Sequence, residues 1–529
     1  MKNICKICSL EFEVTKGDLE FLKKLSPEIG GKKYLISEPK ICPQCRLARR
    51  LSLRAERRLY KRKCDLCKKE MITIFNEKLK KKVYCTDCWW SDKFDPTIHG
   101  RKYDFTRPFF DQYADLMKTV PLPAILVGNS ENSDYTNLAW ANKNCYLTFA
   151  SDYNQDCYYC YYSYTSTNCF DCTNIKDSEL LYECIDVEKC KNSTYLKNCN
   201  NCFDCHHCFD CVSCRDCFGC VGLRNKQYCL FNKQLGREEY LKADKSGVGE
   251  FEELKLKYPH KYAIISNCEN CSGDNLFSCK NCENCYQVIE SEDCKNVVLG
   301  FKSKDCLDCF GVTSSQLCYE SAGSPENYNL LFSSVIWGVS SYLFYSSYCR
   351  SSSNSFGCIS LLKNNYCILN KQYTKEEYED MLPRVIEHMK STGEWGENFS
   401  PKTCPVPYND SAAMDYYPLE KSAALALGYE WYDEDVKSRL PQSKEIFVCK
   451  ECGKNYKISD LEYKFYQKFG INIPVKCPEC RLVARTRKRN PFKLWDRSCA
   501  KCGVEIKTTY SPDRPETIYC EPCYLKTVY

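Results

Sequence analysis

Cysteine recurs at every third position in residues 198–220, the segment that most constrains how this chain can fold. The eight cysteines of the run are Cys199, Cys202, Cys205, Cys208, Cys211, Cys214, Cys217 and Cys220. The same phase holds from Ser133 to Cys229, where small or aliphatic residues often replace cysteine and Asn or Asp often precedes it. A strand repeats every two residues and an α-helix every 3.6, so neither matches a period of three. The repeat therefore predicts a solenoid whose coils have sides of about three residues, each with one small side chain pointing inward.

The spacing leaves two features of this solenoid open. Cysteines recur at intervals of 12 (Cys157 and Cys169) and of 9 (Cys160 and Cys169), which fit coils of four or of three sides. Asn and Asp tolerate left-handed backbone and are expected at the corners. The interior thiols are interpreted first as small apolar fillers. A ladder of ligands for a soft metal or an iron–sulfur cluster, and disulfides, are the alternatives.

The solenoid is duplicated. NSENSDYTNL at 129–138 matches NCENCSGDNL at 267–276, and a longer match links 218–240 to 356–378, both at the same offset. The second copy contains two phase slips, and Thr374 with Glu377 predicts a capping box at the start of its terminal helix. The predicted order is two zinc modules (1–100), a connector (101–130), a solenoid (131–232), a helical cap (233–262), a second solenoid (263–370), a helical cap with an irregular linker (371–443), and two further zinc modules (444–529). We therefore predict a mainly β protein with short helices, built from two tandem Cys-rich triplet-repeat β-solenoids.

Paired Cys-x2-Cys motifs occupy both ends of the chain. Two such pairs can hold one Zn²⁺ in a tetrahedron of thiolates, which leaves no open position for catalysis. The motifs predict about four Zn²⁺ per chain, in zinc-ribbon or treble-clef-like modules. The four predicted ligand sets are Cys5, Cys8, Cys42 and Cys45; Cys64, Cys67, Cys85 and Cys88; Cys449, Cys452, Cys477 and Cys480; and Cys499, Cys502, Cys520 and Cys523.

A basic segment joins the two modules at each end, RLARRLSLRAERRLYKRK at 46–63 and RLVARTRKRNPFKLWDRS at 481–498. Apolar residues recur every four positions in the first and predict a helix over 46–63, whereas Pro491 breaks the second. These segments either pack between the two zinc modules and join them, or they contact phosphate. A forked guanidinium group is well suited to bind phosphate oxygens. The candidate phosphate-binding residues are Arg46, Arg49, Arg50, Arg54, Arg57, Arg58, Arg481, Arg485, Arg487, Lys488 and Arg489.

Charge and hydropathy limit the classes of partner and the cellular compartment that can be expected. The first 100 residues hold 24 Lys and Arg against 13 Asp and Glu, and residues 444–529 hold 18 against 10. The region between them carries a net charge of −13, so a polyanion is expected to bind at the ends. The chain contains no run of about 18 apolar residues, so no membrane span is predicted. The N-terminus has no apolar signal region, and we expect a cytoplasmic protein with reduced or metal-bound thiols.

With these motifs in view, the chain resembles a family of uncharacterised bacterial zinc-ribbon, Cys-rich repeat proteins. The resemblance rests on CPQCRLARRLSLRAERRLYKRKCDLC, YCTDCWWSD, NSENSDYTN and the two FGC…YC…NKQ…EEY caps, and it covers most of the chain. It implies zinc binding but no established activity. Members are sometimes labelled as CaiB/BaiF-type CoA-transferases, a label that this sequence does not support because it shows no α/β transferase pattern.

Two non-catalytic function classes lead, and an enzyme stays open without a motif to support it. The sequence contains no HExxH, P-loop, GxSxG or dinucleotide fingerprint, so no catalytic residue, small-molecule substrate or organic cofactor is indicated. The leading hypothesis is a non-catalytic zinc-binding scaffold that binds nucleic acid through its basic connectors, with structured RNA favoured over DNA. The alternative is a protein-interaction scaffold in which the solenoid faces bind a partner and the basic helices are purely structural.

Overall fold

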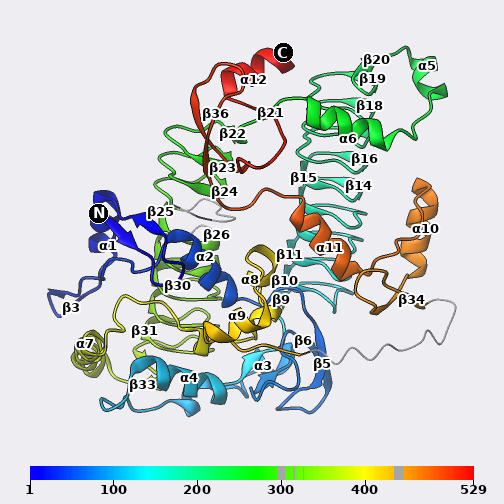
Figure 1. Cartoon of the computed structure of the whole chain (residues 1–529). Coiled ribbons are helices and arrows are strands. Elements are labelled where there is room, and N and C mark those ends of the chain that lie inside the picture. Colours follow the sequence, from blue (N-terminus) through cyan, green and yellow to red (C-terminus); the bar gives the residue numbers. More distant parts are fainter. Residues whose placement is uncertain (296, 298–303, 314–315, 326, 434–445) are drawn as a thin grey trace.

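Figure 1 shows two β-solenoids whose coils advance in opposite directions, with the terminal segments between and around them. The computed structural model describes residues 1–295, 297, 304–313, 316–325, 327–433 and 446–529. The protein is mainly β with short helices; the solenoid strands run from 127 to 368, and four-cysteine clusters flank them at both ends. No described helix is long and apolar enough to cross a membrane.

Each coil of the first solenoid has four sides. Tyr161 pairs with Thr173 and Thr173 with Ile185, so one turn of the coil spans four triplets and the three-sided coil is excluded. One face is a sheet of β9 (Val127–Gly128), β10 (Asn137–Trp140), β11 (Phe149–Asp152), β12 (Tyr161–Tyr164), β13 (Thr173–Lys176) and β15 (Ile185–Glu188). A second sheet comprises β14 (Glu179–Tyr182), β16 (Lys191–Thr194), β17 (Phe203–His206), β18 (Arg215–Phe218), β19 (Gln227–Leu230) and the antiparallel β20 (Lys233–Gln234).

The corners of the coils have left-handed backbone, as the Asn and Asp pattern predicted. Asn168, Asp171 and Asn174 have φ of 53°, 52° and 55°. The conformation recurs along the coils from Leu138 to Phe231, including corners occupied by Leu, Tyr, Glu and Lys. A left-handed conformation is unfavourable for these larger residues. The stacked coils therefore impose the corner, and Asn or Asp lowers its cost where it occurs.

The thiols fill the interior of the solenoid. Cys157 Sγ lies 3.4 Å from the carbonyl oxygen of Gln155 and 3.4 Å from that of Ser166 in the next coil, and most of the interior cysteines repeat this arrangement. Serine takes the same place in some coils, and Ser151 Oγ donates to the Phe149 carbonyl at 2.7 Å. The cysteines whose side chains are described are all free thiols. The geometry fits small side chains that pack and donate weakly to backbone carbonyls, and it disfavours disulfides.

The second solenoid contains the two predicted phase slips. Its first coil is one position shorter than the regular turn, since Ile265 pairs with Leu276, and a later coil is one position longer, since Asn327 pairs with Ser340. The two copies therefore keep the same offset at both ends and differ from it by one position between the slips. The strands of the second copy are β22 (Ile265–Ser266), β23 (Gly273–Phe277), β24 (Cys285–Ile289), β25 (Lys304–Leu307), β26 (Phe310–Thr313), β27 (Gln316–Tyr319), β28 (Ala322–Pro325), β29 (Asn327–Leu331), β30 (Ser340–Phe344), β31 (Ser353–Phe356), β32 (Cys367–Ile368) and β33 (Lys371–Gln372).

Helices cap and connect the solenoids. The connector contains α4 (Phe109–Thr119), the first cap contains α5 (Arg237–Lys242) and α6 (Val248–Lys257), and the second contains α7 (Lys375–Ser391). The capping box of Thr374 and Glu377 at the start of α7 is confirmed. Two short helices, α8 (Ala413–Tyr416) and α9 (Lys421–Ala426), follow in the linker.

The predicted helix over 46–63 is wrong in its second half. Helix α2 (Pro43–Ser52) ends after ten residues, and β5 (Tyr60–Lys63) pairs with β6 (Glu70–Thr73) in an antiparallel hairpin. This hairpin positions Cys64 and Cys67 of the next module. The requirements of that ligand pair override the apolar stripe that continues from Leu51 to Leu59.

Candidate metal centres

The structure brings the sixteen predicted ligands together in four separate clusters. Within each, the four Sγ atoms lie within 4.8 Å of one another. Cys8 and Cys42, Cys67 and Cys85, Cys452 and Cys477, and Cys502 and Cys520 each have an Sγ–Sγ distance of 3.7 Å. A tetrahedron with Zn–S bonds of about 2.3 Å has edges of about 3.8 Å. Each cluster can therefore hold one metal ion, and four thiolates at this spacing fit Zn²⁺.

A β-hairpin supplies the first two ligands of every module. The hairpins are β1 (Lys2–Ile4) with β2 (Glu11–Glu13), β5 with β6, β34 (Ile446–Val448) with β35 (Asn455–Lys457), and β36 (Trp495–Ser498) with β37 (Glu505–Thr508). The residue four positions after the first cysteine has a positive φ in each: Ser9, Lys68, Gly453 and Gly503 at 59°, 64°, 72° and 77°. Its N–H donates to the first cysteine's carbonyl, as from Ser9 to Cys5 at 2.9 Å. The turn aims both thiols inward.

Glycine at this turn is expected to stabilise the N-terminal modules. Ser9→Gly should stabilise the first module by about 0.5–1 kcal/mol, because glycine adopts a positive φ without steric cost. The measurement is the rate of zinc release from the loaded protein to a chromogenic chelator, which should fall. Gly453→Ser, the matched change in the opposite direction, should accelerate release from the third module. Unchanged rates in both variants would show that the turn conformation does not limit metal retention.

Backbone N–H groups favour the thiolate form of the first ligands. The N–H of Cys85 donates to Cys64 Sγ at 3.3 Å, and Cys520 and Cys42 make the same bond to Cys499 and Cys5. Burial raises the pKa of the Cys64 thiol, but hydrogen bonds from the N–H groups of Cys85, Cys67 and Leu66 outweigh burial and lower the pKa to about 7. The corresponding donors lower the pKa of Cys499 to about 6. Thiolates are the form that binds metal, so the backbone prepares each site.

The second ligand pair of every module opens a helix. Cys42, Cys85, Cys477 and Cys520 are the N-cap residues of α2, α3 (Thr86–Trp89), α11 (Pro478–Arg487) and α12 (Glu521–Val528). The positive end of the helix dipole stabilises a thiolate at this place. In the two longer modules an additional helix, α1 (Lys16–Leu25) or α10 (Asp460–Phe469), lies between the ligand pairs and begins with a capping box.

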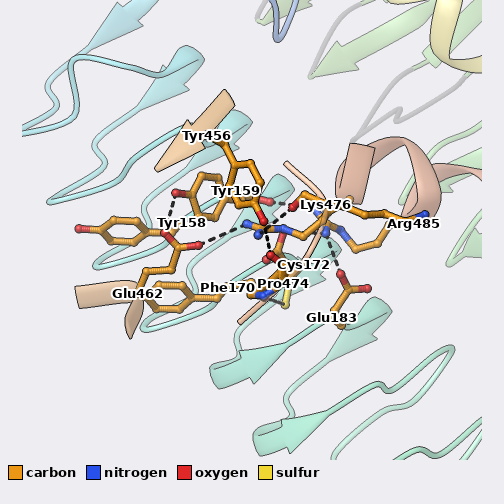
Figure 2. A network of polar contacts seen from close by, with 12 residues as sticks. Tyr158, Tyr159, Phe170, Cys172, Glu183, Tyr456, Glu462, Pro474, Lys476 and Arg485 are labelled. Carbon is orange, nitrogen blue, oxygen red and sulfur yellow. Dashed lines mark hydrogen bonds and ion pairs between the residues drawn. The ribbon is translucent and has the colours of Figure 1, made fainter. Parts of the chain in front are cut away.

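Two arginines of α11, Arg481 and Arg485, lie inside an interface with the first solenoid. Arg485 is fully buried and reaches Asp171 at 2.7 Å. It also reaches Glu183 at 3.1 Å, as Figure 2 shows. Arg481 reaches the same Asp171 at 3.0 Å and Glu462 of α10 at 3.4 Å. Asp171 and Glu183 are corner residues of successive coils, one turn apart. The module is thus fixed to the solenoid flank by paired charges that are shielded from water.

The N-terminal module repeats this interface on the second solenoid. Arg46 of α2 reaches Asp308 at 2.5 Å, and Arg50 lies 3.6 Å from Asp308 and 3.7 Å from Glu320. Arg49 also binds Glu320, at 2.9 Å. Asp308 and Glu320 lie between the two phase slips, at the places that Asp171 and Glu183 occupy in the first copy. The two arginine pairs and the two carboxylate pairs therefore both recur within the chain.

Each zinc-module pair spans both solenoids. The N-terminal pair places α2 on the second solenoid, while its β7 (Val83–Tyr84) pairs with β8 (Leu122–Pro123), the segment that enters the first. The C-terminal pair places α11 on the first solenoid, while its β38 (Ile518–Tyr519) pairs with β21 (His260–Lys261), which enters the second. These contacts link the two solenoids at both ends of the chain and so form a ring of contacts; Figure 1 shows the terminal segments that make them lying between and beside the solenoids.

The remaining candidate phosphate-binding residues divide into paired and exposed ones. Arg54 binds Glu56 at 2.7 Å, Arg57 binds Asp415 and Glu479, and Arg489 binds Asp186 at 2.8 Å. Arg58 is partly exposed and lies 3.7 Å from Asp410. Arg487 and Lys488 are exposed at the end of α11. Nearly all guanidinium groups of the predicted set therefore face protein carboxylates, so phosphate contact by them requires the interface to open.

Sequence reasoning missed the four acceptor carboxylates: Asp171, Glu183, Asp308 and Glu320. The Asn and Asp pattern accounts for Asp171 only as a corner residue and gives the other three no role, yet all four are buried or nearly so. Their signal was recurrence, since the same Asp and Glu pair appears in both solenoids and the same arginine pair appears in the modules at both ends. His206 and His207 lie in none of the four clusters, and Trp89 is buried against Trp90 and Trp337.

Comparison with known proteins identifies no relative. No family model matches the chain, and no curated protein matches it. A crystal structure from Desulfovibrio desulfuricans G20, named as that of a putative acetyltransferase, aligns over 54% of this chain and 85% of its own with 10% identity and a TM-score of 0.10. At these values the alignment indicates neither a shared fold nor a shared activity. The chain is described by its own features, a Cys-rich β-solenoid protein with four four-cysteine clusters, and the family resemblance stays a prediction.

Proposed function

We propose that this protein is a non-catalytic, zinc-dependent scaffold that holds two solenoids together and presents their faces to a protein partner. The observation that carries the proposal is the buried pairing of α2 and α11 with the solenoid corners. Arginines that form buried ion pairs with solenoid carboxylates are not available to bind an external polyanion. Zinc then acts at a distance, because the ions of the first and third modules would fix the starts of α2 and α11, the two helices that carry the buried arginines.

The acidic solenoids supply the interaction surface in this proposal. Solenoids present long, regular faces that suit extended contacts with another protein. The net charge of the region between the zinc-module pairs, −13, favours a basic partner. The known chemistry of the four clusters also agrees, since four cysteine ligands leave no site where a metal could bind a substrate.

The test uses zinc-loaded protein and zinc-stripped protein as baits in parallel, followed by titration of any purified partner. A protein that binds the loaded form in fixed stoichiometry, and binds the stripped form roughly tenfold or more weakly, would support the scaffold. A partner that binds the zinc-loaded and zinc-stripped forms with the same affinity would show that it does not recognise the arrangement of the two solenoids that the zinc modules maintain. Turnover of a small molecule by the purified protein would contradict the non-catalytic assignment.

Nucleic-acid binding is the second candidate, through lysines other than the eleven candidate residues that the sequence indicated. Lys61 and Lys63 are exposed on β5, and Lys68 and Lys69 are exposed in the adjacent zinc turn. These four lysines form a basic patch on the second module that no internal ion pair occupies among the described residues. Phosphate contact there would leave the buried arginines undisturbed.

Changing the four lysines of this patch to Glu tests the second candidate. If the protein binds structured RNA through them, the slope of log K against log salt should flatten by about 3, since each phosphate contact contributes about 0.7–0.9. The control carries Glu at four exposed lysines elsewhere: Lys143, Lys191, Lys280 and Lys375. Equal slopes in both variants, or no binding by the unchanged protein near physiological salt, would exclude RNA binding at this patch.

A further inference from the structure

A cleft of about 700 Å³ lies between the first coils of the first solenoid and the start of α10. Its lining consists of tyrosines and polar residues from successive coils, together with Lys457, Ser459, Asp460 and Leu461 at the start of α10. The lining residues on which the inference depends are Tyr135, Tyr146, Tyr158, Asp134, Asp156 and Asp460. None of them is a metal ligand or belongs to the buried arginine interface.

The tyrosines form a ladder along the solenoid. The ring centroids of Tyr135 and Tyr146 lie 5.3 Å apart, those of Tyr146 and Tyr158 6.0 Å apart, and Phe170 stacks on Tyr158 at 4.9 Å. An amide ladder follows the neighbouring corner, where Asn144 donates to Asp156 at 3.0 Å. The three tyrosines are half-buried, so part of each ring remains open to a ligand.

The charge of the cleft is negative. Asp134 and Asp460 are exposed, Asp156 is half-buried, and Lys457 is the cation among the lining residues. No described residue forms an ion pair with Asp134 or Asp460. Three carboxylates beside aromatic rings suit a guanidinium or ammonium group, which can stack on a ring and bind a carboxylate. The same carboxylates repel phosphate.

The duplication provides an internal comparison. At the matching place in the second solenoid, Asn281 again donates to Asp293 at 3.0 Å, as Asn144 does to Asp156. Lys295 stands where the first copy has Tyr158, and it binds Asp18 of α1 at 2.6 Å and Glu283 at 3.2 Å. Glu283 itself replaces Tyr146. The second copy therefore has ion pairs at this place instead of tyrosines, so the coil itself can form without the tyrosine ladder.

We propose that this cleft binds an arginine-containing basic segment of a protein partner. The inference rests on the proposed scaffold function and names the place on the solenoid where the partner docks. Successive arginines would alternate between tyrosine rings and the carboxylates of Asp134, Asp156 and Asp460. The aromatic ladder repeats along the solenoid axis, which suits an extended segment rather than a single side chain.

Fluorescence anisotropy with a labelled (Arg-Gly-Gly)₃ peptide tests the proposal on the zinc-loaded full chain at low salt. The charge-neutral variant Asp134→Asn/Asp156→Asn/Asp460→Asn should bind the peptide roughly tenfold or more weakly. Asp293→Asn, the matched change in the second solenoid, should leave the affinity within about twofold. Circular dichroism and zinc content establish that each variant is folded. A (Glu-Gly-Gly)₃ peptide and decauridylate serve as the ligand controls.

Three outcomes would overturn the proposal: no saturable binding of the arginine peptide, equal affinity of the triple variant, or stronger binding of decauridylate than of the peptide. Zinc-dependent capture of a partner by the same triple variant would show that the scaffold function stands while the docking site lies elsewhere. If partner binding proves independent of zinc while the arginine peptide still binds the cleft, the scaffold proposal is wrong and the cleft stands as a peptide-binding site.

Discussion

Removal of zinc is expected to unfold all four terminal modules and to leave the two solenoids folded but no longer held together. Structural zinc contributes about 10–16 kcal/mol of apparent binding free energy per site in small zinc-finger peptides, and that energy is folding energy. The hairpins that carry the first ligand pairs consist of strands of only three or four residues, so the metal is expected to supply most of their local stability. Without metal, the ligand thiols take up protons and the bonds that join the two ligand pairs of each site are lost.

The solenoids do not depend on these ions directly. Each coil donates its backbone hydrogen bonds to the next coil, as Tyr161 N–H does to the Cys172 carbonyl at 3.0 Å. The interior cluster of the first solenoid consists of its own thiols and a few aliphatic residues, and it contains none of the sixteen ligands. Its stability is therefore expected to come from repetition of neighbouring coils.

The measurement is chelator titration followed in three ways: strand signal by circular dichroism, the number of thiols that react with a disulfide reagent, and the radius of gyration. We expect the sixteen ligand thiols to become reactive, the strand signal to persist, and the radius of gyration to increase as the ring of contacts opens. Buried solenoid thiols serve as the internal control. Loss of strand signal in the same titration step would show that the solenoids need the modules to fold.

The solenoid was predictable because its information is local. A period of three, the Asn and Asp corners and the internal duplication are all visible in one chain, and they set the coil, the left-handed backbone and the order of the modules. The number of sides was left open because intervals of 9 and 12 both occur among the cysteines. Hydrogen bonding between coils resolves it, since only a four-sided turn aligns Tyr161 with Thr173.

The use of the arginines could not be predicted because their partners are distant in sequence. Arg46 and Asp308 are separated by 262 residues, and Arg485 and Asp171 by 314. Composition identifies a basic helix but does not reveal a carboxylate that folding brings to it, so a buried fastener and a phosphate-binding surface have the same sequence signature. The N-terminal helix α2 contacts the second solenoid and the C-terminal helix α11 contacts the first. This crossed arrangement leaves no local pattern in the sequence.

Arg485→Met is expected to release α11 from the first solenoid. The change removes a cation with no exposed surface and leaves Asp171 and Glu183 with Arg481 and Lys488 as their remaining cations. Breaking a buried ion pair from one side costs about 3–5 kcal/mol, because a charge stays behind in a dry environment. The free energy of local opening of α11, measured by native-state hydrogen exchange, should fall by about that amount. For Arg485→Lys, the opening free energy of α11 should lie between the values of the unchanged protein and of Arg485→Met. An ammonium group keeps the charge but cannot reproduce the forked guanidinium group that reaches both carboxylates.

The matched control is Arg487→Met on the same helix. Arg487 is exposed two positions away, so its replacement should change the opening free energy by less than about 0.5 kcal/mol. If both variants exchange alike, the interface is held by apolar contacts and the ion pairs add nothing. If Arg485→Met exchanges faster on α11 and also on α2, its counterpart at the other end of the chain, then loss of one interface weakens the other. The ring of contacts would then be a single cooperative unit, because opening it at either end frees both solenoids.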